Sequence, residues 1–493
     1  MAKKIYITTA IDYVNAKPHV GHAVEKVQAD VLARWYRNVQ NQDVYFVSGA
    51  DENSLKNVQA ARKVGKPVKE YVDEYVKYFE NLKKEFNLSY DCFVRTTEER
   101  HFKGAQKFWN LFKKEDIYKK NYKGYYCVGC EEFKLEKDLI DGKCPEHGTA
   151  PELIEEENYF FALSKYQDQL IKLIESGKLE ILPDFRKNEV LSFIKGGLAD
   201  FSISRSVERA ENWGVPVPND PSQVMYVWVD ALSNYITALD FDTDGELYKK
   251  YWEGSDERIH VIGKGILRFH AVYWTAMLLS AGLPLPTKII SHEYITIDGK
   301  KISKSLGNVI NPEEVADKFG VDGSRYLLVS SLPSSKDGDI SWEKMEEKYK
   351  ADLSNSLGNL VQRTISMINK YEIKTDRKMR YYSQEEISDA DEEKTAKLIY
   401  DDYMTEFKFD FVLQGVWGEI RKLNIFIDDK KPWVLAKEDD TAELARVLNV
   451  VYWELFDIAK MAEPFMPEIA EKIKDQLESL KPEPLFPRLN EEK

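Results

Sequence analysis

The chain has 493 residues, of which 43% are hydrophobic and 31% charged, with a formal net charge of -14. This length requires more than one hydrophobic core, and the acidity excludes a uniformly basic nucleic-acid binder but not a local basic face. No stretch has the apolar run of a signal peptide or a membrane span, so a membrane role is not expected. Three of the four cysteines lie between residues 127 and 144, which fits a metal site in a reducing cytoplasm better than a disulfide framework.

The N-terminal part alternates between strand and helix patterns. Residues 3–11 and 43–51 are rich in β-branched and aromatic side chains and predict buried strands. Residues 22–40, 55–65 and 68–88 carry apolar side chains at helical spacing. This alternation predicts an α/β fold in which a Rossmann-type parallel sheet is wound with helices.

Four changes in composition and in predicted secondary structure divide the chain into five ranges. Residues 1–115 and 223–292 are expected to form the two halves of the sheet domain, and the Tyr-, Gly- and Cys-rich range 116–222 reads as an inserted domain. Residues 293–350 form a loop-rich region, and 351–493 are predicted to be a helical bundle. A helix-packing seam runs through Leu444, Leu448, Val451, Leu455 and Ile458, and Pro467 fits the first turn of a last helix.

The insertion contains a strong metal-binding pattern. Cys127 and Cys130 are followed by Cys144 and His147, so four soft ligands stand in two pairs of the same spacing. This pattern predicts one closed, tetrahedral and therefore structural Zn²⁺ site. Cys92 stands apart and is expected to be a core residue.

Two of the chain's seven histidines, His19 and His22, stand three apart around Gly21, between a predicted strand and a predicted helix. Residues at this spacing share one face of a helix, and helix N-termini attract phosphate. Gly21 lets a flat ring approach the backbone. Two imidazoles at this place suit the charge that develops during phosphoryl transfer, although two half-buried histidines near a turn would look the same.

A second motif, far downstream, makes the first more specific. Lys300, Lys301 and Lys304 lie in a loop that also contains glycine and serine. Lysine is a flexible point charge suited to a leaving polyphosphate, whereas an isolated charge run is usually a solvated face. The combination of HxGH after a strand and KxSKS downstream is much more specific than either motif alone.

These motifs, HVGH and KISKS, resemble the signatures of class I aminoacyl-tRNA synthetases. The segments TTAIDYVNAKPHVGH, GADENSLKN, VRTTEERH, FSISRSV, YVWVDAL, GKGILRFHAVYW and SLGNLVQR are similar, in the same order, to those of the methionyl-tRNA synthetase family. The resemblance runs from residue 5 to beyond residue 433, which is nearly the whole chain. It implies a methionine–tRNA ligase that forms methionyl-adenylate from ATP and then esterifies the terminal adenosine of tRNA(Met), initiator tRNA included.

The resemblance also implies the roles of individual residues. Catalysis and ATP binding, with Mg²⁺ accompanying the nucleotide, are expected at His19, Gly21, His22, Lys301, Ile302 and Lys304. A methionine pocket is implied at Ala10, Ile11, Tyr13, Asp51, Trp228, Leu232, Tyr235 and His270. Asp51 would pair with the substrate ammonium, and aromatic faces suit a thioether, although such aromatics are more often ordinary core residues.

The chain departs from the family pattern at several positions. Asp12 stands where an aromatic residue or proline is usual, and Asn53 and Ser54 replace a usual His-Gly pair. Gly265 replaces a usual aspartate, which removes an acid near the expected sites while Asp12 adds one. Ile302 replaces the methionine of KMSKS and keeps an apolar side chain there.

The helical region carries a third set of implied residues. Asn359 and Arg363 lie one helical turn apart, and Trp433 follows in KKPWVLAK. In the family these positions read the anticodon, and single-stranded bases are recognised by stacking and hydrogen bonds. From the residues alone, a helix cap and a buried turn tryptophan are equally good interpretations.

A cytoplasmic, monomeric methionine–tRNA ligase is therefore expected. Other synthetases for apolar amino acids are the first alternative, but the leucine, isoleucine and valine enzymes carry a much larger editing insertion, and a cysteine enzyme would use its zinc at the amino acid. An inactive tRNA-binding scaffold is the alternative from another class. The intact HVGH and KISKS motifs argue against it, and the Gly265 change keeps it open. A small adenylyltransferase would use HxGH but lack the helical tail.

Overall fold

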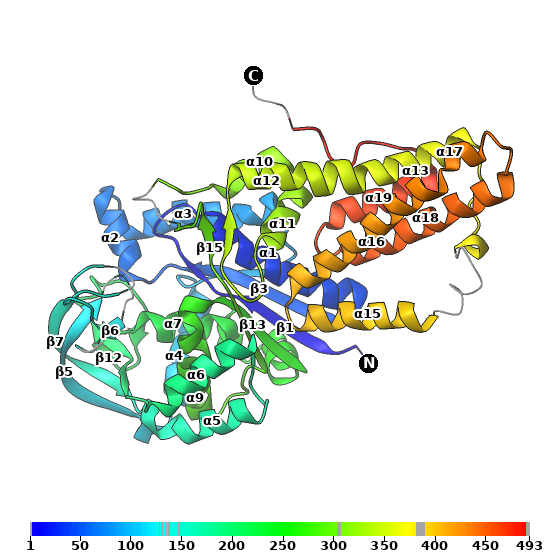
Figure 1. The fold of residues 1–493 in the computed structure, drawn as a ribbon. Coiled ribbons are helices and arrows are strands. Elements are labelled where there is room, and N and C mark those ends of the chain that lie inside the picture. The colour runs from blue at the N-terminus through cyan, green and yellow to red at the C-terminus, as the bar shows by residue number, and fades with distance from the viewer. Residues whose placement is uncertain are drawn as a thin grey trace. The chain divides into compact units, whose positions relative to one another are not determined.

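The structure is a computed structural model and describes residues 2–127, 129, 132–134, 136, 139–145, 148–302, 307–380 and 390–489. The chain divides into two compact units, shown as a ribbon in Figure 1. We call Met1–Pro18, Gln42–Lys84 and Ser89–His292 the sheet unit, and His19–Asn41, Glu85–Leu88 and Glu293–Lys493 the helical unit. Each unit is described by itself.

The sheet unit is built on a seven-stranded parallel sheet with the order β2-β3-β1-β13-β14-β8, in which β4 also pairs with β3. The strands are β1 (Lys4–Thr9), β2 (Asp12–Tyr13), β3 (Asp43–Asp51), β4 (Cys92–Arg95), β8 (Glu180–Leu182), β13 (Glu257–Gly263) and β14 (Lys288–His292). Five of the six residues of β1 are buried, because the strand runs between two neighbours and is covered on both faces. The predicted parallel sheet and its strands at 3–11 and 43–51 are confirmed.

The sheet unit has one large core, to which α4 (Glu99–Leu111), α7 (Val227–Thr237) and α9 (Thr275–Ala281) contribute. Helices α2 (Leu55–Lys63) and α3 (Val68–Glu85) supply the buried residues of a second, smaller cluster with Val14 and Ala50. Helix α4 packs on both α7 and α9. Phe108, Tyr235, Trp252 and Trp274 are among the largest fully buried side chains of the large core.

Residues 116–222, the range predicted to be inserted, contain two small antiparallel sheets. One has the order β6-β5-β7-β9, with β5 (Ile117–Cys127), β6 (Glu132–Lys134), β7 (Glu152–Phe161) and β9 (Phe201–Ser202). The other comprises β10 (Ser204–Ser206), β11 (Pro216–Val217) and β12 (Asp220–Met225). Helices α5 (Gln167–Glu175) and α6 (Asp184–Lys195) lie between β7 and β9 in sequence. The same range also supplies β8, which pairs with β14, so it contributes an edge strand to the parallel sheet. The four predicted domain boundaries stay a prediction.

In the helical unit, α1 (Val20–Arg34) continues into a π-helical turn over Trp35–Val39. The other helices are α10 (Pro312–Phe319), α11 (Val321–Ser330), α12 (Trp342–Lys348), α13 (Asn359–Lys370), α15 (Ala390–Thr405), α16 (Phe409–Lys430), α17 (Pro432–Leu435), α18 (Thr441–Ala462) and α19 (Pro467–Ser479). The five seam residues of α18 are buried, and α18 packs on α13, α16 and α19. The helical bundle and the position of Pro467 at the start of α19 are as predicted.

Part of the region expected to be a loop is instead a small sheet. Strands β15 (Ile295–Ile297), β16 (Lys300–Lys301) and β17 (Gly338–Ile340) pair in the order β16-β15-β17. The β15–β16 connection is a tight turn in which Asp298 and Gly299 both have positive φ angles. Such a turn closes a hairpin and places Lys300 and Lys301, the first lysine of KISKS, on a strand.

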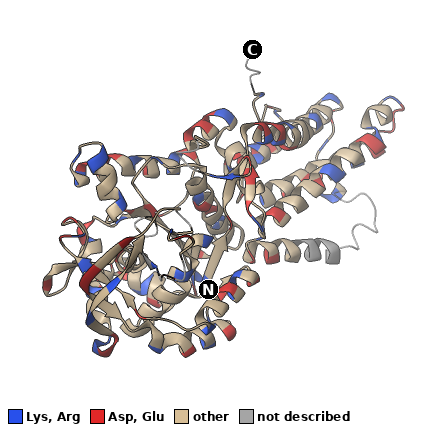
Figure 2. Ribbon diagram, turned by 60° about the vertical axis from the view of Figure 1, so that its left-hand side comes forward, with Lys and Arg blue, Asp and Glu red and all other residues tan. Residues whose placement is uncertain are grey.

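A buried ion pair links the helices of this unit. Arg325 on α11 is fully buried, and its Nη1 lies 2.7 Å from Asp30 of α1. The same Nη1 donates to the Phe86 carbonyl, and the two other guanidinium nitrogens donate to the carbonyls of Phe465 and Pro464. Because the charge is both paired and hydrogen-bonded, the cost of burying it is offset. Figure 2 shows basic and acidic residues interspersed along the helices of each unit. None of the described helices is long and apolar enough to cross a membrane.

Candidate active site

His19 and His22 together form the N-terminal cap of α1. The backbone N–H of Gly21 donates to His19 Nδ1 at 3.1 Å, and the backbone N–H of His19 donates to His22 Nδ1 at 3.0 Å. The two rings stack with centroids 3.9 Å apart. Since each Nδ1 accepts a hydrogen bond, the neutral rings carry their protons on Nε2, which makes both Nε2 atoms donors.

Gly21 is required by this packing. A Cβ on Gly21 would lie 2.9 Å from His19 Cε1 and Nδ1, so any side chain there would displace the imidazole. The same Cβ would lie 3.5 Å from Ile302 Cδ1, which brings the two signature motifs next to each other within the helical unit. The first N–H of α1, from Val20, donates to the carbonyl of Ile310 at 3.1 Å and anchors this arrangement from the other side of KISKS.

The lysine motif is described only in part. Lys301 ends β16 and is exposed, and its carbonyl accepts a hydrogen bond from Asn308 Nδ2 at 3.1 Å. Ile302 is half-buried. Lys304 lies outside the described residues. The structure therefore brings together His19, Gly21, His22 and Ile302 of the predicted ATP site and shows Lys301 on a strand that leads into it.

The predicted methionine-pocket residues all fall in the sheet unit. Ala10, Leu232 and Tyr235 belong to its main core, and Ile11, Tyr13 and Trp228 are half-buried against that core. Tyr13 pairs with Asp51 in the β2–β3 register, directly at the carboxyl end of β3. In open parallel sheets, ligands bind at this end of the strands.

Tyr235 and His270 hold each other. His270 lies in a π-helical turn over Phe269–Trp274, and its Nδ1 bonds to the carbonyl of Ile266 at 2.9 Å. The proton is therefore on Nδ1, and the Tyr235 hydroxyl donates to His270 Nε2 at 2.7 Å. Both side chains are buried, so this pair fixes two walls of the predicted pocket in one orientation.

Behind this pair lies a histidine that the sequence analysis missed. His260 on β13 is fully buried, its Nε2 accepts from Trp274 Nε1 at 3.2 Å, and its Nδ1 bonds to Thr8 Oγ1 at 2.7 Å. Burial is the main cause that lowers the pKa of His260 well below its ordinary value, so the ring is neutral. A polar residue within the apolar run of a central strand is the signal that would have identified it.

Phe269 is a second missed residue. Its ring stacks on Trp228 with centroids 3.9 Å apart and an interplanar angle of 6°. Because Trp228 is only half-buried, this stack with Phe269 helps to fix the orientation of a predicted pocket aromatic that the core does not enclose. In the sequence, only the position of Phe269 directly before His270 indicated a place near the pocket.

Asp51 is buried and ends β3, where it takes part in a polar network. The backbone N–H of Asn53 donates to Asp51 Oδ1 at 3.2 Å, and Asn57 Nδ2 donates to the Asp51 carbonyl at 2.9 Å. Asn57 lies on α2, which Ser54 caps through its hydroxyl. The departures from the family pattern at Asn53 and Ser54 are therefore integral parts of this turn.

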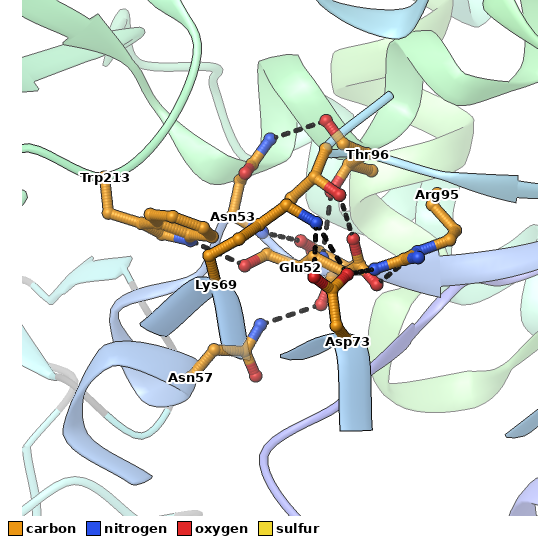
Figure 3. A network of polar contacts seen from close by, with 10 residues as sticks. Glu52, Asn53, Asn57, Lys69, Asp73, Arg95, Thr96 and Trp213 are labelled. Carbon is orange, nitrogen blue, oxygen red and sulfur yellow. Dashed lines mark hydrogen bonds and ion pairs between the residues drawn. The ribbon is translucent and has the colours of Figure 1, made fainter. Parts of the chain in front are cut away.

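The neighbouring residue, Glu52, is held at each end. Arg95 Nε donates to Glu52 Oε1 at 2.8 Å (Figure 3). The backbone N–H of Glu52 donates to Thr96 Oγ1 at 2.8 Å, and the Glu52 carbonyl accepts from Trp213 Nε1 at 2.7 Å. Burial raises the pKa of Glu52, and the Arg95 contact opposes that rise. Arg95 also pairs with Asp73, which connects this turn to α3. The network makes the Asp51 turn rigid.

Two of the four predicted zinc ligands are described. Cys127 ends β5 and Cys144 lies in a tight turn closed by hydrogen bonds from Cys144 N–H to the Thr149 carbonyl and from Gly148 N–H to the Cys144 carbonyl. Both thiols are buried, with 1% and 0% of their surface exposed. Cys130 and His147 lie outside the described residues, and within the described ranges no three metal-ligating side chains cluster. Cys92, expected in the core, is half-buried and accepts from Arg100.

The predicted anticodon residues lie together in the helical unit. Asn359 and Arg363 are on α13, and the Arg363 guanidinium lies over the ring of half-buried Trp433 on α17. Asn359 is exposed and, because α13 continues the helical turns before it, is not a helix cap. The simpler interpretation of Asn359 as a helix cap is therefore wrong.

Comparison with known proteins identifies the family. The family model for class I tRNA synthetases (M) matches residues 5–150 and 134–365. The methionine–tRNA ligase of Caldanaerobacter subterraneus is 42% identical over 483 residues, which cover 97% of this chain and 74% of that protein. That of Thermotoga maritima is 42% identical over 477 residues, which cover 95% of this chain and 74% of that protein. The chain belongs to the methionine–tRNA ligase family.

A solved structure of this family has the same fold. The structure of Mycobacterium tuberculosis methionyl-tRNA synthetase in complex with methionyl-adenylate matches with a TM-score of 0.89 and 37% identity, covering 99% of this chain and 100% of that one. The α/β class with a helical C-terminal region is thus the fold of methionine–tRNA ligases. The signatures of class I synthetases are present here as HVGH and KISKS.

Proposed function

We propose that the chain is an ATP-dependent methionine–tRNA ligase. The methionine carboxylate oxygen attacks the α-phosphorus of ATP, the bond from that phosphorus to the bridging oxygen breaks, and pyrophosphate leaves. The 3'-terminal adenosine of tRNA(Met), initiator tRNA included, then displaces AMP from the methionyl-adenylate to form the ester. The observation that carries this proposal is the stacked His19–His22 cap beside Ile302, in a chain of this family.

The two histidines supply hydrogen-bond donors for the phosphates. Their Nδ1 atoms are engaged by the backbone, which orients both Nε2–H groups without any cost at the moment of reaction. The positive end of the α1 dipole acts on the same charge. Lys301 and Lys304 add mobile cations for the leaving pyrophosphate. Mg²⁺, which accompanies ATP, further neutralises the phosphate charge.

Methionine recognition is assigned to the carboxyl edge of the parallel sheet. Asp51 pairs with the substrate ammonium, and the backbone and side chains of Ala10, Ile11 and Tyr13 border it. Trp228, Leu232, Tyr235 and His270 line the thioether end, where sulfur makes favourable contacts with aromatic rings. The Tyr235–His270 hydrogen bond supports this assignment, because it keeps the polar atoms of both walls satisfied without substrate.

Zinc is assigned a structural role in the insertion. Cys127, Cys130, Cys144 and His147 would hold the ion, and the buried thiols of Cys127 and Cys144 with the tight turn at Cys144 fit such a site. Zinc held by these residues would supply structural crosslinking of the insertion. Asn359, Arg363 and Trp433 are assigned to the anticodon. The enzyme is further proposed to act as a cytoplasmic monomer.

Methionine-dependent ATP–pyrophosphate exchange, measured with each of the twenty amino acids, tests this function. We expect methionine to be the best substrate, with norleucine and selenomethionine weaker but detectable, since an apolar pocket separates near-isosteres by only about 1–3 kcal/mol. Faster exchange with leucine or isoleucine than with methionine would contradict the assignment. Absence of exchange with tRNA binding intact would favour the inactive scaffold.

A further inference from the structure

Asn53 occupies the turn between Asp51 and α2, and only 7% of its surface is exposed. Its backbone N–H donates to Asp51 Oδ1 at 3.2 Å. Any movement of Asn53 therefore moves the carboxylate that is assigned to the methionine ammonium.

The side chain of Asn53 points away from this bond, to two acceptors at once. Its Nδ2 donates to the Thr96 carbonyl at 2.9 Å and to Asp230 Oδ2 at 2.8 Å. Both partners present oxygen, so only an NH₂ group satisfies them, and the amide cannot be reversed. The bond to Asp230 is charge-assisted, and such bonds are roughly twice as strong as neutral ones.

Asp230 is itself fixed in place. It is 1% exposed, and His101 Nε2 on α4 bonds to its Oδ1 at 2.6 Å, while His101 Nδ1 bonds to Thr237 Oγ1 at 2.8 Å. Both Asp230 and Thr237 lie on α7, the helix that also carries Trp228, Leu232 and Tyr235. His101 and Asn53 thus hold the two oxygens of one carboxylate on the pocket helix.

We propose that Asn53 is a positioning residue for methionine, which sets the separation between the Asp51 carboxylate and the side chains of α7. The proposal rests on the methionine-activating function given above. One amide joins the turn that holds the ammonium group to the helix that holds the thioether end. Because the ammonium and the thioether of one methionine must reach both sites at once, this link sets the separation that the substrate has to span.

Steady-state exchange kinetics of Asn53→Ala, with methionine and ATP varied separately, test the proposal. We expect the KM for methionine to rise about tenfold or more, as for loss of a hydrogen bond to a charged group, with the KM for ATP changed less than about twofold. Ser54→Ala is the matched control: it removes a buried side chain and the α2 cap in the same turn but does not touch Asp230. Its KM for methionine should stay near that of the wild type.

Asn53→Asp gives a readout that a purely structural role would not change. The substitution keeps the size but sets two carboxyls against each other, which raises the pKa of the introduced one. On lowering the pH from about 8 to about 6, that group takes up a proton and donates again to Asp230, so the KM for methionine should recover relative to wild type. A KM for methionine in folded Asn53→Ala within about twofold of wild type, or an Asn53→Asp profile parallel to wild type, would overturn the proposal. Absence of exchange in the wild type itself would instead refute the proposed function.

Discussion

The guanidinium carbon of Arg363 lies 5.1 Å from the centroid of the Trp433 ring, and Arg363 also donates to Asp428 at 3.0 Å. The Arg363 guanidinium thus covers one face of the Trp433 indole, and Asp428 on α16 holds the guanidinium in place. A planar guanidinium over an indole is the arrangement that a stacked base extends or replaces. This relationship makes Trp433 and Arg363 the place to test anticodon reading.

Trp433→Ala should reduce tRNA charging about tenfold or more, because stacking one base contributes about 1–3 kcal/mol. ATP–pyrophosphate exchange without tRNA should hardly change. Trp417→Ala is the control, since Trp417 is buried and stacks on Tyr326, and its loss should cost about 3–5 kcal/mol of stability and both activities. Equal loss of charging and exchange in Trp433→Ala, tracking a lower melting temperature, would show that Trp433 serves only the core.

His22→Ala removes one stacked ring and the acceptor of the His19 N–H. If His22 stabilises charge that develops on the phosphates, the rate of adenylate formation should fall by about 100-fold or more while methionine binding is unchanged. Rapid-quench measurement of methionyl-adenylate gives the rate, and methionine titration followed by tryptophan fluorescence gives the affinity. Unchanged turnover would mean that the histidines act only as a helix cap.

Lys304→Ala should likewise slow adenylate formation, by loss of a donor that is worth on the order of 3 kcal/mol in the transition state. Lys300→Ala is the comparison, because Lys300 is an exposed lysine of the same motif that has no assigned role. Its kinetics should match the wild type. Equal effects of the two substitutions would show that these lysines act only through their general positive charge and that Lys304 has no specific role.

Metal analysis of the purified chain should give one zinc per molecule. Cys144→Ser should lower the zinc content and increase protease cleavage within residues 117–161, because the buried thiol would be lost from the turn. The parallel sheet should remain folded, as judged by methionine-dependent exchange. A fully active protein that contains no metal would contradict the zinc assignment.

Asp322 predicts a pH dependence of stability. Burial raises its pKa to about 6, and its Oδ2 accepts from the N–H of Ile469 in the first turn of α19. A carboxyl whose pKa is raised by folding adds stability that is fully present below the unfolded pKa of about 4 and is lost as the pH rises through about 6. Asp322→Asn keeps the acceptor without the charge, so it should raise the free energy of unfolding by about 1–3 kcal/mol near neutral pH but not at about pH 4.

Denaturant unfolding at several pH values provides the measurement. If Asp322→Asn were instead less stable near neutral pH, the Asp322 charge would be needed to neutralise the buried Arg325, with which it interacts electrostatically. The wild-type curve would then fall, not rise, on acidification through this range.

Local patterns predicted much of what is seen. The strands at 3–11 and 43–51, the helix that follows His22 and the seam of α18 all follow from periodicity, which reports which face is buried. The stacking of His19 on His22 was not predictable, because it depends on side-chain rotamers, which periodicity does not report. The Asn53–Asp230 bond joins residues 177 positions apart, and no local pattern reports such a contact. Strand β8 was missed for the same reason, since its partner β14 lies far along the chain.

The position of β1 in the sheet has a consequence for synthesis of the protein. Ile5 pairs with Val44 on one side, but on the other side its partner is Glu257. At about 5–20 residues per second, the ribosome needs about 10–50 s to deliver β13 after β1 and β3 have emerged. During that time the edge of the apolar strand β1 that later pairs with β13 has no hydrogen-bonding partner. An unpaired strand edge can pair wrongly with other chains. The nascent chain is therefore expected to require chaperone protection until the first half of the sheet is closed by the second.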